Sequence, residues 1–235
     1  MSLASYVAFV TSNRRFVAFG FLMAFASSFG QTYFVGIFGP AVQAEFALSH
    51  TAWGTIYMIG TLASAAVLPW SGKYIDRIDL RQYTSVVCAF IAFACLFMSQ
   101  VSSAIMLAVA IFLLRHSGQG LMSHTAITSM GRYFRAHRGR AIATLGFAAG
   151  EALLPFAAVI AIAAVGWRWS YGLVGILLAV GVMPIVLWLL VGHDERHRAH
   201  IARQSDKELS ATANEPAWTR AEVLRDIRFY LILPG

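Results

Sequence analysis

The sequence predicts an all-α membrane protein in which six transmembrane helices form one bundle, followed by the start of a seventh helix. Of its 235 residues, 58% are hydrophobic and only 12% are charged, whereas soluble domains carry about 25% charged residues. The apolar residues are gathered in six stretches, each close to the ~20 residues that a helix needs to cross the hydrocarbon of a bilayer. Because a segment in lipid must pair its own backbone N–H groups, each stretch is expected to be a helix.

The six predicted spans are residues 16–42, 53–71, 83–99, 104–122, 141–165 and 169–192. The first is longer than the apolar core of a signal peptide and contains Gln31, so it is expected to stay in the membrane. Cys88 and Cys95 lie about two helical turns apart in the third span and are expected to act as apolar packing residues. Gly146 and Gly150, four residues apart in the fifth span, would let helix backbones approach closely.

Three regions follow from this pattern. Residues 1–192 are expected to form the six-helix bundle, residues 193–228 a cytoplasmic linker, and residues 229–235 the start of a truncated seventh helix. Near the end of the linker, Pro216 is followed by Trp218 and Val223 at helical spacing, which predicts a short amphipathic helix at the membrane interface. Because the seventh apolar run is too short to span, we expect the chain to be a fragment or a truncated product.

The distribution of basic residues predicts the orientation. Connections 42–52 and 100–103 contain no Lys or Arg, whereas connections 72–82 and 131–140 contain three and four. The short link 166–168 contains one Arg, and further basic residues follow residue 192. By the positive-inside rule, the N-terminus and the 193–228 linker face the cytoplasm, and the chain is expected to be a multi-pass protein of the cytoplasmic (inner) membrane.

The composition also excludes several classes of function. The net charge of +7 follows from the basic connections, so nucleic acid is not expected as a partner. The sequence shows no metal-ligand spacing, nucleotide loop or nucleophile–base pattern, so neither an enzyme nor a cofactor is expected. The expected partners are the lipid bilayer, a small-molecule substrate, and either a C-terminal six-helix half or a second copy of this chain.

Four motifs stand at fixed places relative to the spans. After the second span comes Gly72-Lys-Tyr-Ile-Asp76-Arg77-Ile-Asp79-Leu80-Arg81. The fourth span holds Arg115-His-Ser-Gly-Gln-Gly120, the fifth holds Gly146-x-x-x-Gly150 with Pro155, and Gly166-Trp-Arg-Trp169 precedes the sixth. Together they resemble the major facilitator superfamily, whose loop after the second helix reads Gly-x-x-x-Asp-Arg-x-Gly-Arg-Arg. The segment from Trp218 to Phe229 is similar to the approach to the seventh helix in the monocarboxylate or oxalate–formate-like branch.

The resemblance implies a fold of two six-helix bundles with the substrate held between them, and this sequence matches the first bundle. Each bundle of the family consists of two inverted three-helix repeats. The family's loop after the second helix helps latch one state of the transport cycle. The resemblance carries this gating role to Gly72, Asp76, Arg77 and Arg81. Asp79 stands where the family has Gly, so the latch geometry is expected to differ. Plain positive-inside topology is the alternative interpretation of the same loop.

Two full charges lie well inside predicted spans. Arg115 is about twelve residues from the start of the fourth span and Glu151 about eleven from the start of the fifth, so at ~1.5 Å rise per residue both fall near the middle of the bilayer. An isolated charge there costs ~2.5–3.5 kcal/mol on insertion scales. One hypothesis is an Arg115–Glu151 ion pair that fastens the two helices. The other is that one or both face a central cavity, where Arg115 could bind a carboxylate and Glu151 could carry a proton. The two hypotheses can coexist.

Polar residues at similar depth extend the list of candidates. Gln31 in the first span and Gln119 in the fourth are expected to bind substrate or to join helices through hydrogen bonds. At ~100° per residue, Gln119 shares a helix face with Arg115. Tyr33 and Tyr57 are weaker candidates for the same cavity.

The predicted function is secondary transport of a small solute, an organic anion such as a monocarboxylate, by alternating access, with this chain as the N-terminal half. Arg115 favours an anion. The alternatives are proton-coupled efflux of drugs or metabolites, which Glu151 and the Gly- and Pro-containing fifth helix would suit, and a truncated half-molecule that does not transport.

Overall fold

The computed structural model describes residues 3–134, 138–193, 195, 198 and 225–226. Contacts divide the chain into two compact units, Met1–His193 and Asp194–Gly235. The predicted interfacial helix before residue 229 lies almost wholly outside the described residues, and the predicted start of a seventh helix lies entirely outside them. The first unit is described below.

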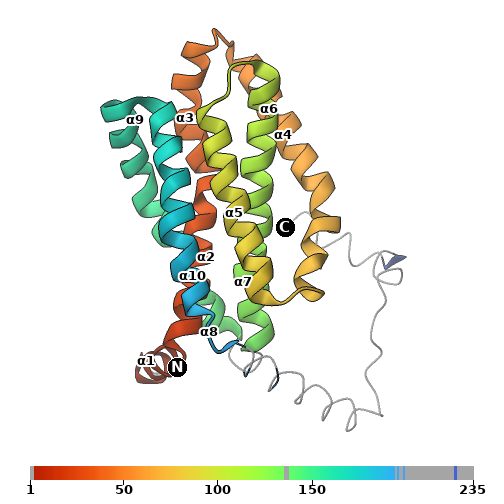
Figure 1. Ribbon diagram of the computed structural model, residues 1–235, viewed down its shortest axis with the longest axis vertical. Coiled ribbons are helices and arrows are strands. Elements are labelled where there is room, and N and C mark those ends of the chain that lie inside the picture. The colour runs from red at the N-terminus through yellow and green to blue at the C-terminus, as the bar shows by residue number, and fades with distance from the viewer. Residues whose placement is uncertain (1–2, 135–137, 194, 196–197, 199–224, 227–235) are drawn as a thin grey trace. The chain divides into compact units, whose positions relative to one another are not determined.

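The described helices of this unit include six crossings. Figure 1 shows how they are arranged. The first consists of α2 (Arg14–Ser27), η1 (Ser28–Gly30) and α3 (Thr32–Glu45), the second of α4 (His50–Ser71) with η2 (Gly72–Asp76) after it, and the third of α5 (Leu80–Ser99). The fourth consists of α6 (Ala104–Leu114), η3 (Arg115–Met122) and α7 (Ser123–Tyr133). α9 (Phe147–Leu177) carries the fifth crossing and begins the sixth, which η5 (Leu178–Val182) and α10 (Met183–Leu189) complete.

The fifth and sixth crossings belong to one long element that reverses at Gly166. This glycine has φ 79° and ψ 163°, a left-handed conformation that residues with a Cβ rarely adopt. Gly146, near the start of α9, lies against Phe21 and Phe25 of α2, whereas Arg168, just after the reversal, bonds to Glu45 at the end of α3. Figure 1 shows the two halves of α9 side by side. Within the described residues, the reversal therefore yields six crossings from five apolar helical segments. This confirms the prediction of an all-α membrane bundle.

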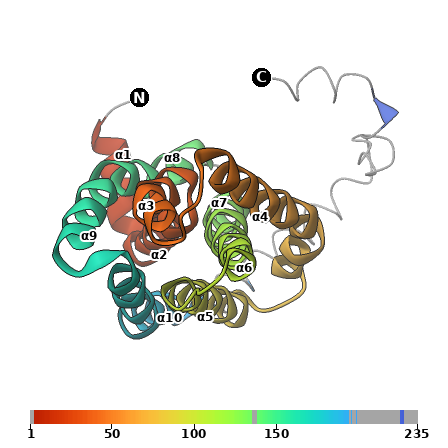
Figure 2. The same ribbon diagram turned by 90° about the horizontal axis from the view of Figure 1, so that it is seen from above.

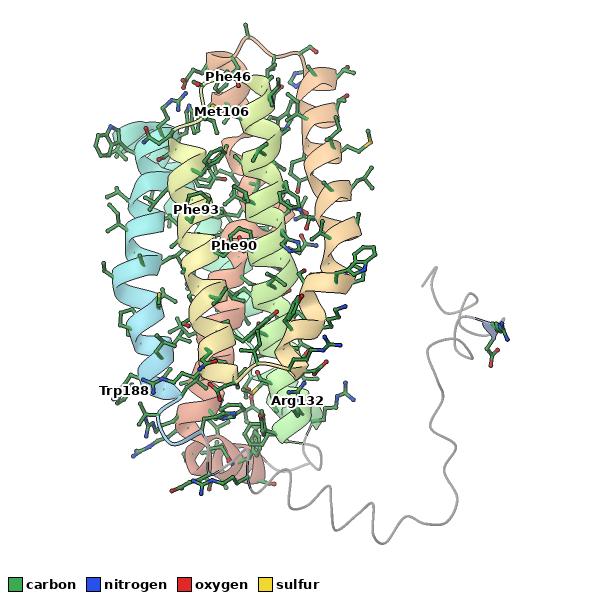
Figure 3. All side chains as sticks on the ribbon, turned by 45° about the vertical axis from the view of Figure 1, so that its right-hand side comes forward. Phe46, Phe90, Phe93, Met106, Arg132 and Trp188 are labelled. Atoms are coloured by element: carbon green, nitrogen blue, oxygen red, sulfur yellow. The ribbon has the colours of Figure 1, made fainter. Side chains whose placement is uncertain are left out.

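The two ends of the bundle differ in character. One end, here called the basic end, holds Arg14, Arg15, Arg132 and Trp188. The opposite end holds Phe46 and Met106. Figure 3 shows Arg132 and Trp188 at one end and Phe46 and Met106 at the other. In Figure 2 the first and fourth crossings lie in the middle, between α4 and the first half of α9, with α5 and α10 along one side.

The fourth crossing is longer than the sequence predicts. The predicted end at residue 122 precedes a run of Ser, His and Thr, yet the helix continues to Tyr133. The hydroxyls in this run bond back to their own helix: Thr125 donates to the carbonyl of Leu121 at 2.7 Å and Ser129 to that of Thr125 at 2.6 Å. A polar residue that is satisfied in this way need not end a helix.

Two short helices were not predicted as separate elements. α1 (Leu3–Ser12) precedes the first crossing, and its Phe9 packs edge-on against Phe134, with ring centres 5.0 Å apart. α8 (Arg138–Ala143) precedes the fifth crossing. The predicted fifth span, 141–165, therefore divides at Thr144–Gly146, where the chain leaves the helical conformation.

Large apolar side chains cover much of the outer surface of the bundle. Leu62, Phe156 and Val180 are 60%, 74% and 71% exposed. Soluble monomers rarely expose contiguous apolar surface on this scale, so lipid is the solvent of this face. The chain is an integral membrane protein.

Candidate functional site

The first crossing is broken midway. α2 ends at Ser27, η1 covers three residues, and Gln31 is extended with φ −77° and ψ 154° before α3 begins at Thr32. The backbone N–H of Gln31 donates to the carbonyl of Ser28 at 3.0 Å. This bond spans three residues, so the turn is tighter than the four-residue turn of an α-helix. Such a break frees backbone carbonyls that, within a membrane, must find partners in the protein, in water or in a ligand.

The fourth crossing meets the first at this break, backbone against backbone. A Cβ placed on Gly118 would lie 2.6 Å from the Cα of Gly30, a distance that no side chain could tolerate. Over Arg115–Met122 the fourth crossing is a π-helix. The two glycines and the serine of this segment weaken the α-helical preference, and single π-helical turns often occur at functional sites.

Arg115 fills the gap that the break opens. Its side chain is buried, with only 7% of the residue exposed. Its Nη1 donates to the carbonyl of Gly30 at 3.3 Å and to Oγ1 of Thr32 at 2.8 Å. The guanidinium carbon lies 5.6 Å from the centre of the Tyr57 ring, within the range of a cation–π contact. Arg115 thus satisfies a carbonyl at the break and joins the first, second and fourth crossings.

Several buried polar atoms have no hydrogen-bond partner within the described residues. They include Nε of Arg115, the hydroxyl of Tyr57 and Oγ1 of Thr61. Tyr57 and Thr61 are four residues apart on α4 and therefore share one helix face. Because buried polar atoms are almost always paired, these groups are candidates for binding water or a polar ligand.

The predicted Arg115–Glu151 ion pair does not form in the structure. The ion pairs of the bundle that the structure gives are Arg132–Asp76 and Arg168–Glu45, and neither includes Arg115 or Glu151. Glu151 is exposed, and its neighbour Gly150 packs against Ser28 on the other side of the first crossing. Figure 2 shows this crossing between α9 and the fourth crossing. The two charges therefore share a depth, as the residue counts predict, but the first crossing separates them.

The other predicted cavity residues divide between the two sides. Gln31 is partly buried at the break itself. The Tyr33 hydroxyl lies 3.2 Å from where a Cβ on Gly150 would stand, and so next to Glu151. Gln119 is exposed although Arg115 is buried, because the wider i→i+5 turn of the π-helix changes the angle between the two side chains.

The loop between the second and third crossings is tied to the fourth. Nη2 of Arg132 donates to Oδ1 of Asp76, and Nη1 of Arg132 lies 3.5 Å from the carbonyl of Ile75. Arg77 and Arg81 are exposed, and Gly72 lies beside His124. Of the four predicted loop residues, the structure therefore places Asp76 in an ion pair and Gly72 in a helix contact.

Asp79 is a helix cap. Its Oδ1 accepts from the backbone N–H groups of Arg81 at 2.9 Å and of Gln82 at 3.1 Å, where α5 begins. Its φ of −52° places no demand for glycine on this position. Asp79 therefore stabilises the start of α5, and the expected difference in latch geometry stays a prediction.

Comparison with known proteins identifies the family of the chain. The family model described as Major Facilitator Superfamily matches residues 20–233. The chain belongs to the major facilitator superfamily. It is accordingly a membrane transport protein. No curated protein matches the chain.

A second group of polar contacts lies at the opposite end of this major facilitator bundle. Arg168 donates to Oε1 of Glu45 at 2.6 and 2.8 Å, and to the carbonyls of Ser99 at 3.0 Å and Val101 at 2.6 Å. Nε1 of Trp167 donates to the second Glu45 oxygen at 2.6 Å. These residues, here called the Glu45–Arg168 clamp, hold the ends of the first, third and sixth crossings together.

Sequence reasoning missed several residues that the structure brings to the break or the clamp. Thr32 follows Gln31 directly, and Thr61 repeats the position of Tyr57 one turn later, so a search for polar faces in apolar helices would have found both. The contact of Glu45 with Arg168 spans 123 residues. No local pattern in the sequence indicates it.

Proposed function

We propose that this major facilitator protein transports a small organic anion, such as a monocarboxylate, and binds it at Arg115. The observation that carries the proposal is the state of this arginine: it is buried, and no carboxylate of the described residues pairs with it. An uncompensated charge at this depth costs ~2.5–3.5 kcal/mol on insertion scales. An anionic substrate would supply the missing countercharge.

The arrangement around Arg115 suits a carboxylate. Nη1 is held by Gly30 and Thr32, which fixes the plane of the guanidinium and leaves Nε to donate. A fixed guanidinium binds carboxylates with two parallel bonds, which an ammonium group cannot do. The Tyr57 and Thr61 hydroxyls, unpartnered in the described structure, would bind further polar atoms of the substrate.

The transport cycle in this proposal is alternating access between this bundle and a second six-helix unit, either a C-terminal half or a second copy of the chain. The basic end faces the cytoplasm of the inner membrane, and the Asp76–Arg132 pair opens and closes with the cycle. Glu151, exposed beside Tyr33, carries the coupling proton. Support for this assignment comes from the position of Glu151 within the fifth crossing and from its separation from Arg115 by the first crossing.

Direct binding tests the anion. We expect radiolabelled monocarboxylates to bind saturably to the purified chain in a scintillation proximity assay. The affinity should fall about tenfold or more in Arg115→Gln, as for loss of one charged hydrogen-bond pair. Arg115→Lys should recover only part of it, because lysine lacks the planar fork. Arg14→Gln, an exposed arginine at the basic end, is the matched control and should bind normally.

Two further arms complete this test. Glu151→Gln should keep carboxylate binding but lose its dependence on pH. Equal binding of carboxylates to the wild type and to Arg115→Gln, or preferential binding of organic cations to both, would contradict an anion site at Arg115.

A further inference from the structure

A second polar pocket lies at the basic end, between α7 and α8. Its volume is about 580 Å³, and it is lined by Ile127, Thr128, Gly131, Arg132 and Arg138. None of these residues contacts Arg115 or belongs to the broken crossing. The pocket is therefore a separate feature of the bundle, built where the fourth crossing ends and the fifth approaches.

Arg138 supplies an uncompensated positive charge to this pocket. A Cβ on Gly131 would lie 3.2 Å from Nε of Arg138, so the glycine lets the guanidinium lie directly on the backbone of α7. No carboxylate within the described residues forms an ion pair with Arg138. Arg138 is also exposed, which leaves its donors accessible from the pocket.

Arg132 supplies a second guanidinium group to the pocket. Its Nη1 lies 3.5 Å from the carbonyl of Ile75, at the limit of a hydrogen bond. Its Nη2 bonds to Asp76, whose side chain is 62% exposed, while the Arg132 side chain is 24% exposed. Asp76 does not line the pocket. Asp76 thus neutralises one of the two arginines from outside, so the described lining of the pocket carries a net positive charge.

We propose that this pocket binds a negatively charged phosphate group, which either an anionic lipid headgroup or free phosphate could supply. Two guanidinium groups provide the planar donor pairs that match phosphate oxygens, and the Thr128 hydroxyl adds a neutral donor. The absence of a side chain on Gly131 leaves room for the group. Basic pockets between transmembrane helices are a known setting for such headgroups, and Ile127, 41% exposed, offers an apolar contact beside it.

Native mass spectrometry of the purified 235-residue chain would test the site. Retention of phosphatidylglycerol, which carries a net negative charge, would be compared with that of zwitterionic phosphatidylcholine. We expect phosphatidylglycerol to be preferred by the wild type and its affinity to fall about tenfold in Arg138→Gln, the size expected for one charged hydrogen-bond pair. Arg14→Gln removes the same charge from the same end, outside the pocket, and should retain the lipid normally.

Inorganic phosphate in excess distinguishes the two sources. Loss of phosphatidylglycerol on adding phosphate would show that the pocket takes the phosphate group from either source. Retention under phosphate, combined with loss in Arg138→Gln, would assign the pocket to the lipid headgroup. If Arg138→Gln does not fold, Thr128→Val, which keeps both charges, should still weaken binding. Equal retention of phosphatidylglycerol by the wild type and both variants would overturn the proposal.

Discussion

Two glycines set how closely the first and fourth crossings approach. Gly30 and Gly118 place their backbones in direct contact, and the same contact positions Arg115 to reach the carbonyl of Gly30. In a membrane, helix association depends on such close packing because lipid provides no hydrophobic driving force between helices. The two residues therefore contribute to both the stability of the bundle and the geometry of the site.

Replacing Gly118 by Ala should destabilise the bundle. The added methyl group would meet the Cα of Gly30 at 2.6 Å, and such overpacking costs about 1–3 kcal/mol. The measurement is the midpoint of unfolding in detergent. Gly36→Ala is the control, since nothing lies within 4 Å of its Cβ position, and alanine should leave stability equal or slightly higher. Equal midpoints for Gly118→Ala and the wild type would show that the crossing can separate without cost.

Arg115 could be identified from the sequence because a charge inside an apolar run is rare and has few explanations. Its partners could not. Residue counts place Glu151 and Arg115 at a similar depth in the bilayer. They do not indicate on which side of the first crossing each residue lies. The actual partners, a backbone carbonyl at Gly30 and the Thr32 hydroxyl, become available only because the helix breaks. Gly and Ser in an otherwise apolar run predict such a break weakly.

Among the helices, α5 begins with an unusually well-defined cap at Asp79. We expect Asp79→Ala to reduce the free energy of unfolding by about 0.5–2 kcal/mol, because two backbone N–H groups lose their acceptor. Asp79→Gly, which restores the usual family residue, should cost only a few tenths of a kcal/mol. Asp79→Asn should be close to the wild type. Unfolding midpoints of the three variants provide the comparison, and a larger loss for glycine than for alanine would argue against the capping role.

The lengths of the helices were predicted best where apolar runs and helices coincide, as in α4 and α5. The fourth crossing was predicted too short because hydropathy falls after Met122, while the hydroxyls of Thr125 and Ser129 are satisfied within the helix. Hydropathy does not predict the division between α8 and α9, because it stays high through Leu145 and Gly146 although the helix stops there. Hydropathy therefore indicates whether a segment lies in lipid or in water. It indicates the backbone conformation of the segment less directly.

At the scale of the whole bundle, the Glu45–Arg168 clamp should contribute to stability through Arg168 more than through Glu45. Arg168→Ala removes bonds to Glu45 and to two backbone carbonyls, at roughly 0.5–1.5 kcal/mol for each net hydrogen bond. Glu45→Gln keeps one acceptor oxygen, so Arg168 or Trp167 loses its bond to this side chain. It also removes a part-exposed charge pair, worth about 1 kcal/mol or less, but it leaves the bonds from Arg168 to the carbonyls of Ser99 and Val101. Unfolding midpoints should therefore fall further for Arg168→Ala.

Arg81→Ala is the control for the clamp, because it removes an exposed arginine at the other end of the bundle. Hydrogen exchange should also quicken at the amides of residues 167–170 in Arg168→Ala and stay unchanged in Arg81→Ala. Equal decreases in the unfolding midpoint for Glu45→Gln and Arg168→Ala would contradict this prediction. The stabilisation would then come from the contact with Glu45 and not from the contacts with the carbonyls.

Both ends of the first crossing are completed by the sixth, and this has a consequence for biogenesis. Arg15 donates to the carbonyl of Trp188, 173 residues later in the chain. Glu45 accepts from Arg168, 123 residues later. At a synthesis rate of ~5–20 residues per second, the ribosome needs roughly 9–35 s to make the chain between Arg15 and Trp188. During that time the earliest helix rests in the bilayer without its final neighbours, so nascent chains that stop before the sixth helix should be the ones that quality-control proteases remove.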